Sequence, residues 1–194
     1  MLNLYRAPRL ASAAAFAVLL GALAGCAQKA GGSASAAAGM SAPSSKVAKA
    51  DQEMMKDIVE ANLAEIETGK LALEKSRNTH IRAFAQKMID DHSSAMQALQ
   101  ALARTKGIDL PKETDLQHKA MATGLSVLSG DTFDRRYLQH IGIADHQHTL
   151  DLLKKTIQIT NDRDLRAHAT QMMPVVEQHL AIAERMTSMA GAAR

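Results

Sequence analysis

Residues 81–99, which read IRAFAQKMIDDHSSAMQAL, contain the clearest periodic pattern in the chain. Apolar residues recur there every three or four positions, which is the spacing of an amphipathic α-helix. The apolar stripe comprises Ile81, Ala85, Met88, Met96 and Leu99. One polar residue, His92, lies in the middle of this stripe. The segment therefore predicts a helix that buries one face and carries a histidine into the core.

The helical period continues on both sides of this stretch. We expect long helices over residues 52–77, 79–106, 132–160 and 162–188. Short turns at Asn78 and Asn161-Asp162 join them into two antiparallel hairpins. Gly107 is expected to end the second helix, and Asp131 is a candidate N-cap of the third. Pro174 predicts a kink or a break in the fourth helix, because proline lacks a backbone N–H.

Residues 108–130 connect the two hairpins and contain Pro111, with a short helix expected near 113–128. This connection is long enough to cross the bundle. The sequence therefore predicts an all-α, ferritin-like four-helix bundle over residues 51–190, with a long helical crossover between the second and third helices.

Composition agrees with helices, because the chain is 46% hydrophobic but only 3% aromatic and has no tryptophan. Alanine and methionine supply much of the apolar share. With 11 glycines, 4 prolines and one cysteine in 194 residues, the chain is neither collagen-like nor a disulfide scaffold. The charged fraction of 22% and the apolar share also exclude a wholly disordered chain.

The N-terminal 25 residues have the features of an export signal. Arg6 and Arg9 precede an uncharged apolar run over residues 10–24. The run ends in Leu23-Ala-Gly-Cys26, which resembles the bacterial lipobox, so we expect a lipoprotein signal peptide over residues 1–25 and a lipid on Cys26. The alternative is an ordinary signal peptide with a chance cysteine. Cys26 is the only cysteine, so no intramolecular disulfide can form.

Residues 26–50 are rich in alanine, glycine and serine and are expected to form a flexible tether after the lipidated cysteine. Ala27, by resemblance to envelope lipoproteins, favours the outer membrane, with the domain in the periplasm and the membrane as a partner through the lipid anchor. Removing Arg6 and Arg9 lowers the net charge from +3 to about +1. With few aromatic residues left, we expect no nucleic-acid partner.

Four polar residues lie on the inner faces of the expected helices, one on each. In an antiparallel hairpin, residues equidistant from the turn lie side by side, and this spacing puts all four at one level of the bundle. Three imidazoles and a carboxylate suit a divalent transition metal ion, with Fe, Mn, Zn and Cu as candidates. Asp91 and Asp145 each precede a histidine and would serve as ligands or orient a neighbouring imidazole. The four predicted ligands are Glu65, His92, His146 and His179.

The alternative is a metal-free, hydrogen-bonded polar network in a non-catalytic envelope or stress-related module with an envelope protein partner. A redox enzyme would need a second metal or an open coordination position, and the sequence offers no clear second set of ligands. The Glu-x-x-His motif of di-iron bundles does not occur in the chain. Methionines near His92 and His179 would suit Cu(I), but methionine is more often a core filler. The pattern does not predict an oligomeric state.

The other histidines have weaker patterns. His80 and His118 are expected in solvent, and His140 at the edge of an apolar stripe. His148 is a reserve ligand. His168 is expected to fill space near one end of the bundle, about 16 Å from His179 along the helix axis.

Four segments together resemble the bacterial envelope family known as domain of unknown function 4142. They are residues 63–72 (LAEIETGKLA), residues 83–92 (AFAQKMIDDH), the pair Asp145-His146 and the stretch from Pro174 to His179. The resemblance covers about residues 52–188. It implies a ferritin-like bundle that is exported and often lipid-anchored, without a settled activity.

Overall fold

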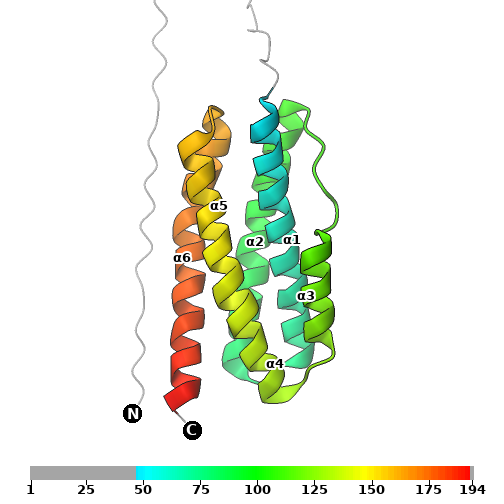
Figure 1. The fold of residues 1–194 in the computed structure, drawn as a ribbon, viewed down its shortest axis with the longest axis vertical. Helices are drawn as coiled ribbons and strands as arrows, with labels where there is room; N and C mark the ends of the chain where they lie inside the picture. The colour runs from blue at the N-terminus through cyan, green and yellow to red at the C-terminus, as the bar shows by residue number, and fades with distance from the viewer. Residues whose placement is uncertain (1–46, 193–194) are drawn as a thin grey trace, which may run out of the picture. The chain divides into compact units, whose positions relative to one another are not determined.

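The computed structural model describes residues 47–192, which form a bundle of helices (Figure 1). No strand occurs among these residues, so the all-α prediction is confirmed. The signal peptide, Cys26 and nearly all of the tether predicted from the sequence lie outside the described residues. The elements are α1 (Lys49–Lys75), α2 (Thr79–Lys106), α3 (Leu116–Ser126), α4 (Gly130–Tyr137), the π-helix η1 (Leu138–Asp145), α5 (His146–Ile159) and α6 (Arg163–Ala192).

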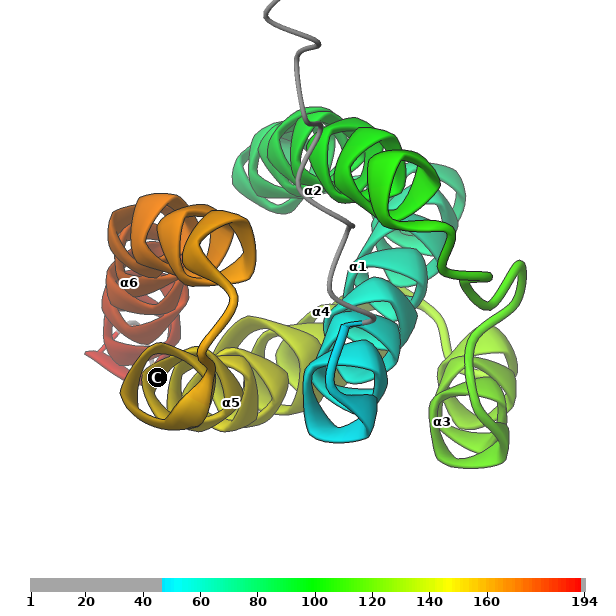
Figure 2. The same ribbon diagram turned by 90° about the horizontal axis from the view of Figure 1, so that it is seen from above.

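The helices pair as the sequence predicts. α1 and α2 form one antiparallel hairpin, and α5 and α6 form the other (Figure 1). Seen from above, α3 lies on the outer side of α1, away from α6 (Figure 2). The chain returns along α3 to the end of the bundle where α2 began, and this return confirms the long helical crossover. Within residues 47–192, no helix is both long enough and apolar enough to cross a membrane.

The two hairpin turns are short because side chains cap the helices that follow them. The Asn78 side chain accepts hydrogen bonds from the backbone N–H groups of His80 and Ile81. The Asp162 side chain does the same for Asp164 and Leu165. These oxygens satisfy amide groups that have no partner inside the helix.

The start of α4 corrects one prediction. Ser129, not Asp131, occupies the N-cap position of this helix. Gly130 has a φ of 54°, a left-handed conformation that glycine adopts without a steric penalty. The helix therefore begins earlier than expected, and Asp131 lies in its first turn, where a negative charge suits the helix dipole.

Of the two outcomes expected at Pro174, a kink or a break, the break does not occur, and the fourth long helix stays undivided. α6 continues through Pro174 as one helix from Arg163 to Ala192. Pro174 and Thr170 are both exposed. The Thr170 carbonyl loses its helical partner at a proline four residues later, and water can replace that hydrogen bond on an exposed surface.

The third long helix runs without a break through α4, η1 and α5, but not all of it is α-helix. Its middle, η1, is a π-helix, in which backbone hydrogen bonds span five residues instead of four. At Gly142, a Cβ atom would lie 2.7 Å from the Cβ of Ala183, so η1 and α6 approach very closely there. The hydrophobic periodicity that predicts a helix does not distinguish these two helix types.

The apolar core consists of two clusters with different composition. The first, here the methionine cluster, lies toward the α5–α6 turn. The second, here the aromatic cluster, lies toward the α1–α2 turn and contains all three aromatic residues of the described chain. The methionine cluster includes Met54, Met55, Met96, Leu99, Leu153, Leu165 and Met172, and the aromatic cluster includes Ile81, Phe84, Met88, Phe133, Tyr137 and Ile141.

Candidate metal centre

A layer of polar side chains lies in the buried interior, at a level between the two apolar clusters. Glu65 comes from α1, His92 from α2, His146 from the first position of α5, and His179 from α6. None of the four residues is more than 2% exposed. The structure therefore brings together the four residues that the sequence places at one level of the bundle.

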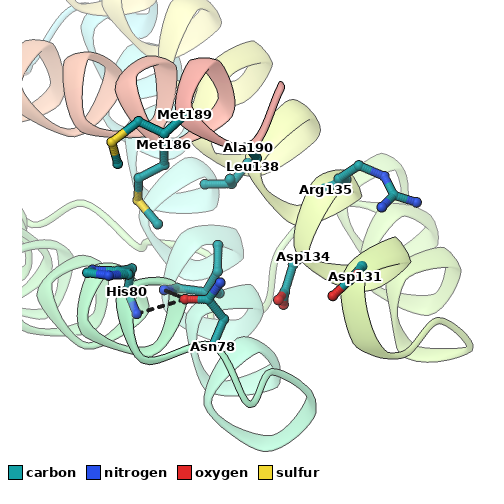
Figure 3. A pocket seen from close by; sticks show the side chains of 10 residues that line it. Asn78, His80, Asp131, Asp134, Arg135, Leu138, Met186, Met189 and Ala190 are labelled. Carbon is teal, nitrogen blue, oxygen red and sulfur yellow. Dashed lines mark hydrogen bonds between the residues drawn. The ribbon is translucent and has the colours of Figure 1, made fainter. Parts of the chain in front are cut away.

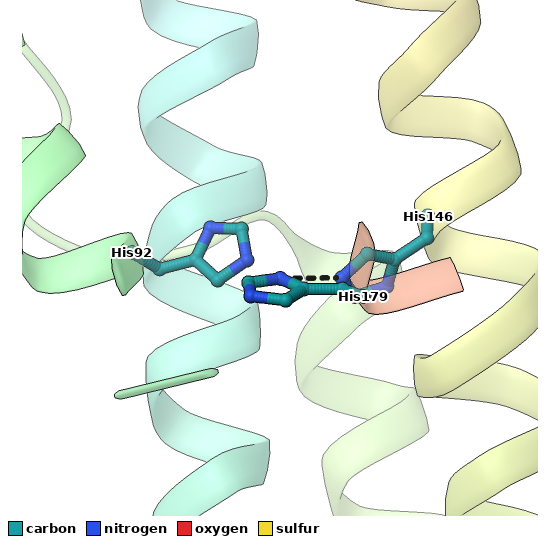
Figure 4. A group of neighbouring side chains, drawn as sticks. All are labelled: His92, His146 and His179. Carbon is teal, nitrogen blue, oxygen red and sulfur yellow. Dashed lines mark hydrogen bonds between the residues drawn. The ribbon is translucent and has the colours of Figure 1, made fainter. Parts of the chain in front are cut away.

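The three imidazole rings converge from three different helical elements (Figure 4). Their ring centroids are 5.2 to 5.8 Å apart. Each ring offers one nitrogen, and these three nitrogens all lie within 4.8 Å of one another. This spacing allows one ion to contact all three rings after small side-chain adjustments.

The hydrogen-bond partners of His92 determine which of its nitrogens carries the hydrogen. The amide nitrogen of Asn62 donates to the carbonyl of Ile58 at 2.7 Å, so the amide oxygen of Asn62 faces His92. That oxygen lies 3.1 Å from Nδ1 of His92 and accepts its hydrogen. Nε2 of His92 is consequently the free nitrogen, and it is buried without a hydrogen-bond partner among the described residues.

Hydrogen-bond acceptors also determine which nitrogen of His146 and of His179 carries the hydrogen. Nδ1 of His146 lies 2.8 Å from the carbonyl oxygen of Ile141, which can only accept, so this nitrogen carries the hydrogen. Nε2 of His179 lies 2.8 Å from Oδ2 of Asp91 and donates to that carboxylate. The nitrogens left without hydrogen are Nε2 of His146 and Nδ1 of His179.

These two free nitrogens face each other at 3.4 Å, as the dashed line in Figure 4 marks. Two nitrogen lone pairs at this distance repel unless a proton or a cation lies between them. Burial lowers the pKa of His146, and burial lowers the pKa of His179 to about 4 in spite of the hydrogen bond to Asp91. A proton is therefore disfavoured near neutral pH, and a metal ion fits the lone pairs better.

Glu65 lies beside the hydrogen-bearing nitrogens of two of the rings, His92 and His146. Its Oε2 is 2.8 Å from Nδ1 of His92, and its Oε1 is 3.7 Å from Nδ1 of His146. Neither oxygen accepts a well-directed hydrogen bond from the described residues. Burial raises the pKa of Glu65, but His92 and His146 lower it by more, to about 2. The buried carboxylate is therefore a negative charge that a nearby cation would compensate.

The two aspartates of the predicted site lie in different surroundings. Asp91 is at the edge of the layer, where it contacts His179 and the ammonium group of Lys87, each at 2.8 Å. Asp145 is half-buried, and its Oδ2 has no hydrogen-bond partner within residues 47–192. The structure thus brings Asp91 to His179 as an orienting partner, whereas Asp145 contacts none of the three imidazoles; neither aspartate belongs to the group of atoms within 4.8 Å of one another.

The structure also places the remaining histidines. His148 is exposed, so it does not face the core as a reserve ligand. His80 is exposed as predicted, whereas His118 is half-buried and pairs with Asp115 at 2.7 Å. His140 is half-buried, and His168 is buried.

Two partners of the layer are absent from the sequence-based prediction. Asn62 lies three residues before Glu65 on α1, and this spacing puts both on one face of the helix. That position is a signal that sequence reasoning could have used. The carbonyl of Ile141 had no such signal, because its position depends on the π-helix.

A separate pocket lies at the end of the bundle that contains the α1–α2 turn, between the start of α2, α4 and the end of α6 (Figure 3). Its volume is about 390 Å³. Asp131, Asp134 and Arg135 contribute polar groups, and Met186 and Met189 form part of an apolar wall. None of its lining residues belongs to the histidine layer. Among the described residues, the three histidines are the only group of three or more His, Cys, Asp or Glu side chains whose ligand atoms lie within 4.8 Å of one another.

The chain belongs to the family described as Domain of unknown function (DUF4142), which it matches over residues 36–186. This match confirms the family resemblance that the four sequence segments indicate. The bundle is similar to the crystal structure of a DUF305 fragment from Deinococcus radiodurans, with a TM-score of 0.67 and 14% sequence identity. The similarity covers 75% of this chain and 99% of that fragment, and it concerns the fold alone. No curated protein matches the chain.

Proposed function

We propose that this protein binds a divalent transition metal ion between His92, His146 and His179. The observation that carries the proposal is the facing pair of free nitrogens on His146 and His179, with a third free nitrogen on His92. Each ring is also held from its other nitrogen by an acceptor, which is the usual arrangement for histidines that bind a metal ion.

The chemistry of the donors narrows the choice of ion. Neutral imidazoles suit Zn, Cu and Fe in proteins, whereas Mg²⁺, Ca²⁺ and Mn²⁺ prefer oxygen ligands. Glu65 would contribute a compensating negative charge from its position beside the hydrogen-bearing nitrogens of His92 and His146. The layer is closed to water at 0 to 2% exposure, which favours a held ion over one that turns over a substrate.

Metal analysis of the purified domain without an affinity tag tests this proposal. We expect about one transition metal ion per chain, and a rise in the melting temperature of the metal-free protein when the ion is restored. The alternative, a metal-free polar network, predicts no metal by elemental analysis and no thermal shift with Fe, Mn, Zn or Cu. It also predicts that His92→Ala lowers stability while a chelator has no effect on the wild-type protein.

We also propose that the protein is a lipoprotein of the outer membrane, with the bundle in the periplasm. The support is the sequence Leu23-Ala-Gly-Cys26 after an uncharged apolar run, together with Ala27. Labelling cells with a radioactive fatty acid should mark the wild-type protein and leave Cys26→Ser unmarked. A labelled Cys26→Ser protein would contradict this part of the proposal, as would wild-type protein in the inner-membrane fraction.

A further inference from the structure

His168 is a buried histidine that the metal centre does not use. It is 7% exposed and lies on α6, eleven residues before His179. Its Nε2 atom is buried and has no hydrogen-bond partner among the residues that the structure describes. A buried polar atom without a partner is costly, so a ligand at this position would explain the residue.

His168 lines a groove of about 210 Å³ between α2 and α6. On the α2 side, Ser94, Ala95 and Ala98 contribute small side chains to the lining. Asp91 lines the same groove, and its Oδ2 accepts the hydrogen bond from Nε2 of His179. The lining of the groove is therefore one hydrogen bond away from the three-histidine layer.

Met172 adds a second ligand type to this groove. It follows His168 by four residues, so the two side chains lie on the same face of α6. Met172 is 8% exposed and also lines the groove. Burial lowers the pKa of His168, so its imidazole is neutral and able to bind a metal ion. A neutral imidazole with a thioether is a ligand pair that suits Cu(I).

We infer that the groove between α2 and α6 is the route by which Cu(I) reaches the three-histidine layer, with His168 and Met172 as a transit site. The inference rests on the proposed metal-binding function and extends it from divalent ions to monovalent Cu(I), since imidazoles also suit copper. The ion would bind Nε2 of His168 and the sulfur of Met172, and would then pass Asp91 to reach His179. The copper stays in the Cu(I) state throughout, so the transfer needs no oxidant or reductant.

The rate of Cu(I) loading tests the inference. Metal-free protein is mixed with Cu(I) held by a chromogenic chelator, and the transfer is followed by the loss of the chelator colour. His168→Gln and Met172→Leu should each load about tenfold more slowly, the size of effect expected when one partner of a metal is removed. Both variants should reach the wild-type copper content at equilibrium, which also shows that they are folded.

Two substitutions outside the groove serve as matched controls. Met173→Leu makes the same chemical change at the next position of α6, and His148→Gln removes an exposed histidine that lines a different groove. Both should load at the wild-type rate. Zn(II) loading should be unaffected by Met172→Leu, because zinc gains little from a thioether.

The outcomes separate the two proposals. Wild-type protein that takes up no Cu(I) would overturn the transit site, and a lack of Fe, Mn and Zn binding as well would remove the proposed function. Wild-type protein that loads while His168→Gln and Met172→Leu load at the same rate would overturn the transit site alone. Slower loading in both control variants would also overturn it.

Discussion

The sequence Asp-His occurs twice in this protein, on α2 and at the junction of η1 with α5, and the two copies differ in what the aspartate does. In both copies the histidine enters the buried layer. Asp91 reaches across to His179 at 2.8 Å and is itself held by Lys87. Asp145 has a buried oxygen without a hydrogen-bond partner in the described part of the chain. The same dipeptide therefore supplies an orienting group in one place and an unsatisfied carboxylate in the other.

The difference arises from the neighbours of each helix. Consecutive residues on a helix point about 100° apart, so the aspartate faces a different neighbour from its histidine. On α2 that neighbour is α6, with an imidazole to contact. Burial and the negative charge of Glu65 raise the pKa of Asp145 to about 6. The position of an aspartate in the sequence does not reveal which of these surroundings it will meet.

Loss of the buried histidine of either Asp-His pair should have the largest effect on metal binding, because each pair supplies one of the three imidazoles. His146→Ala should abolish stoichiometric metal binding, measured by elemental analysis after dialysis. His148→Ala, on an exposed position two residues later, should keep the wild-type metal content. Retained metal in His146→Ala would show that the second pair contributes no ligand.

Removing each aspartate tests the comparison directly. Asp91→Ala should weaken metal binding by about 10- to 100-fold, because His179 loses the group that fixes its hydrogen on Nε2. Asp145→Ala should change the dissociation constant by less than about twofold, since Asp145 touches none of the three imidazoles. Competition titration with a chelator measures both constants. Equal losses in the two variants would contradict the division of roles.

Gly142 allows η1 to pack closely against α6, next to the second Asp-His pair. Gly142→Ala should lower the free energy of unfolding by about 1–3 kcal/mol, because the new Cβ would meet Ala183 at 2.7 Å and push η1 away from α6. Gly124→Ala on α3 is the matched control, since a Cβ added there would meet no heavy atom of the described residues within 4 Å. That variant should gain about 0.5–1 kcal/mol from helix propensity. Urea unfolding measures both, and a stable Gly142→Ala protein would show that η1 can move without cost.

The smallest effect concerns Asp162, a paired aspartate like Asp91 but far from the metal layer. Burial raises the pKa of Asp162, but hydrogen bonds from Lys106 and Leu165 lower it by more. A lowered pKa means that the charged form stabilises the fold above about pH 4 and that this contribution disappears as the pH falls further. Asp162→Asn should lower the free energy of unfolding at pH 7 by about 0.2–1 kcal/mol, with little effect at pH 3. Urea unfolding at the two pH values checks this, and an equal loss at both would exclude the ionic contribution.

Much of this arrangement is predictable from sequence because it depends on local periodicity. The stripe from Ile81 to Leu99 predicts α2 and the inward direction of His92. Equal distances from the turns predict that Glu65 meets His92 and that His146 meets His179, and these pairs lie at 2.8 Å and 3.4 Å. The exposed position of His148 is where the same reasoning is wrong.

The amino-acid sequence is enough to predict a helical bundle and the three histidines that turn toward its interior. Those features follow from the 3.6-residue period and the cost of exposing apolar side chains. The protonation pattern of the layer depends on the folded structure, because Asn62 and Asp91 fix the hydrogens of His92 and His179 from neighbouring helices, and the Ile141 carbonyl fixes that of His146 through the π-helix. The free nitrogens of His92 and His179 are therefore set by contacts between helices, and no single stretch of sequence encodes those contacts.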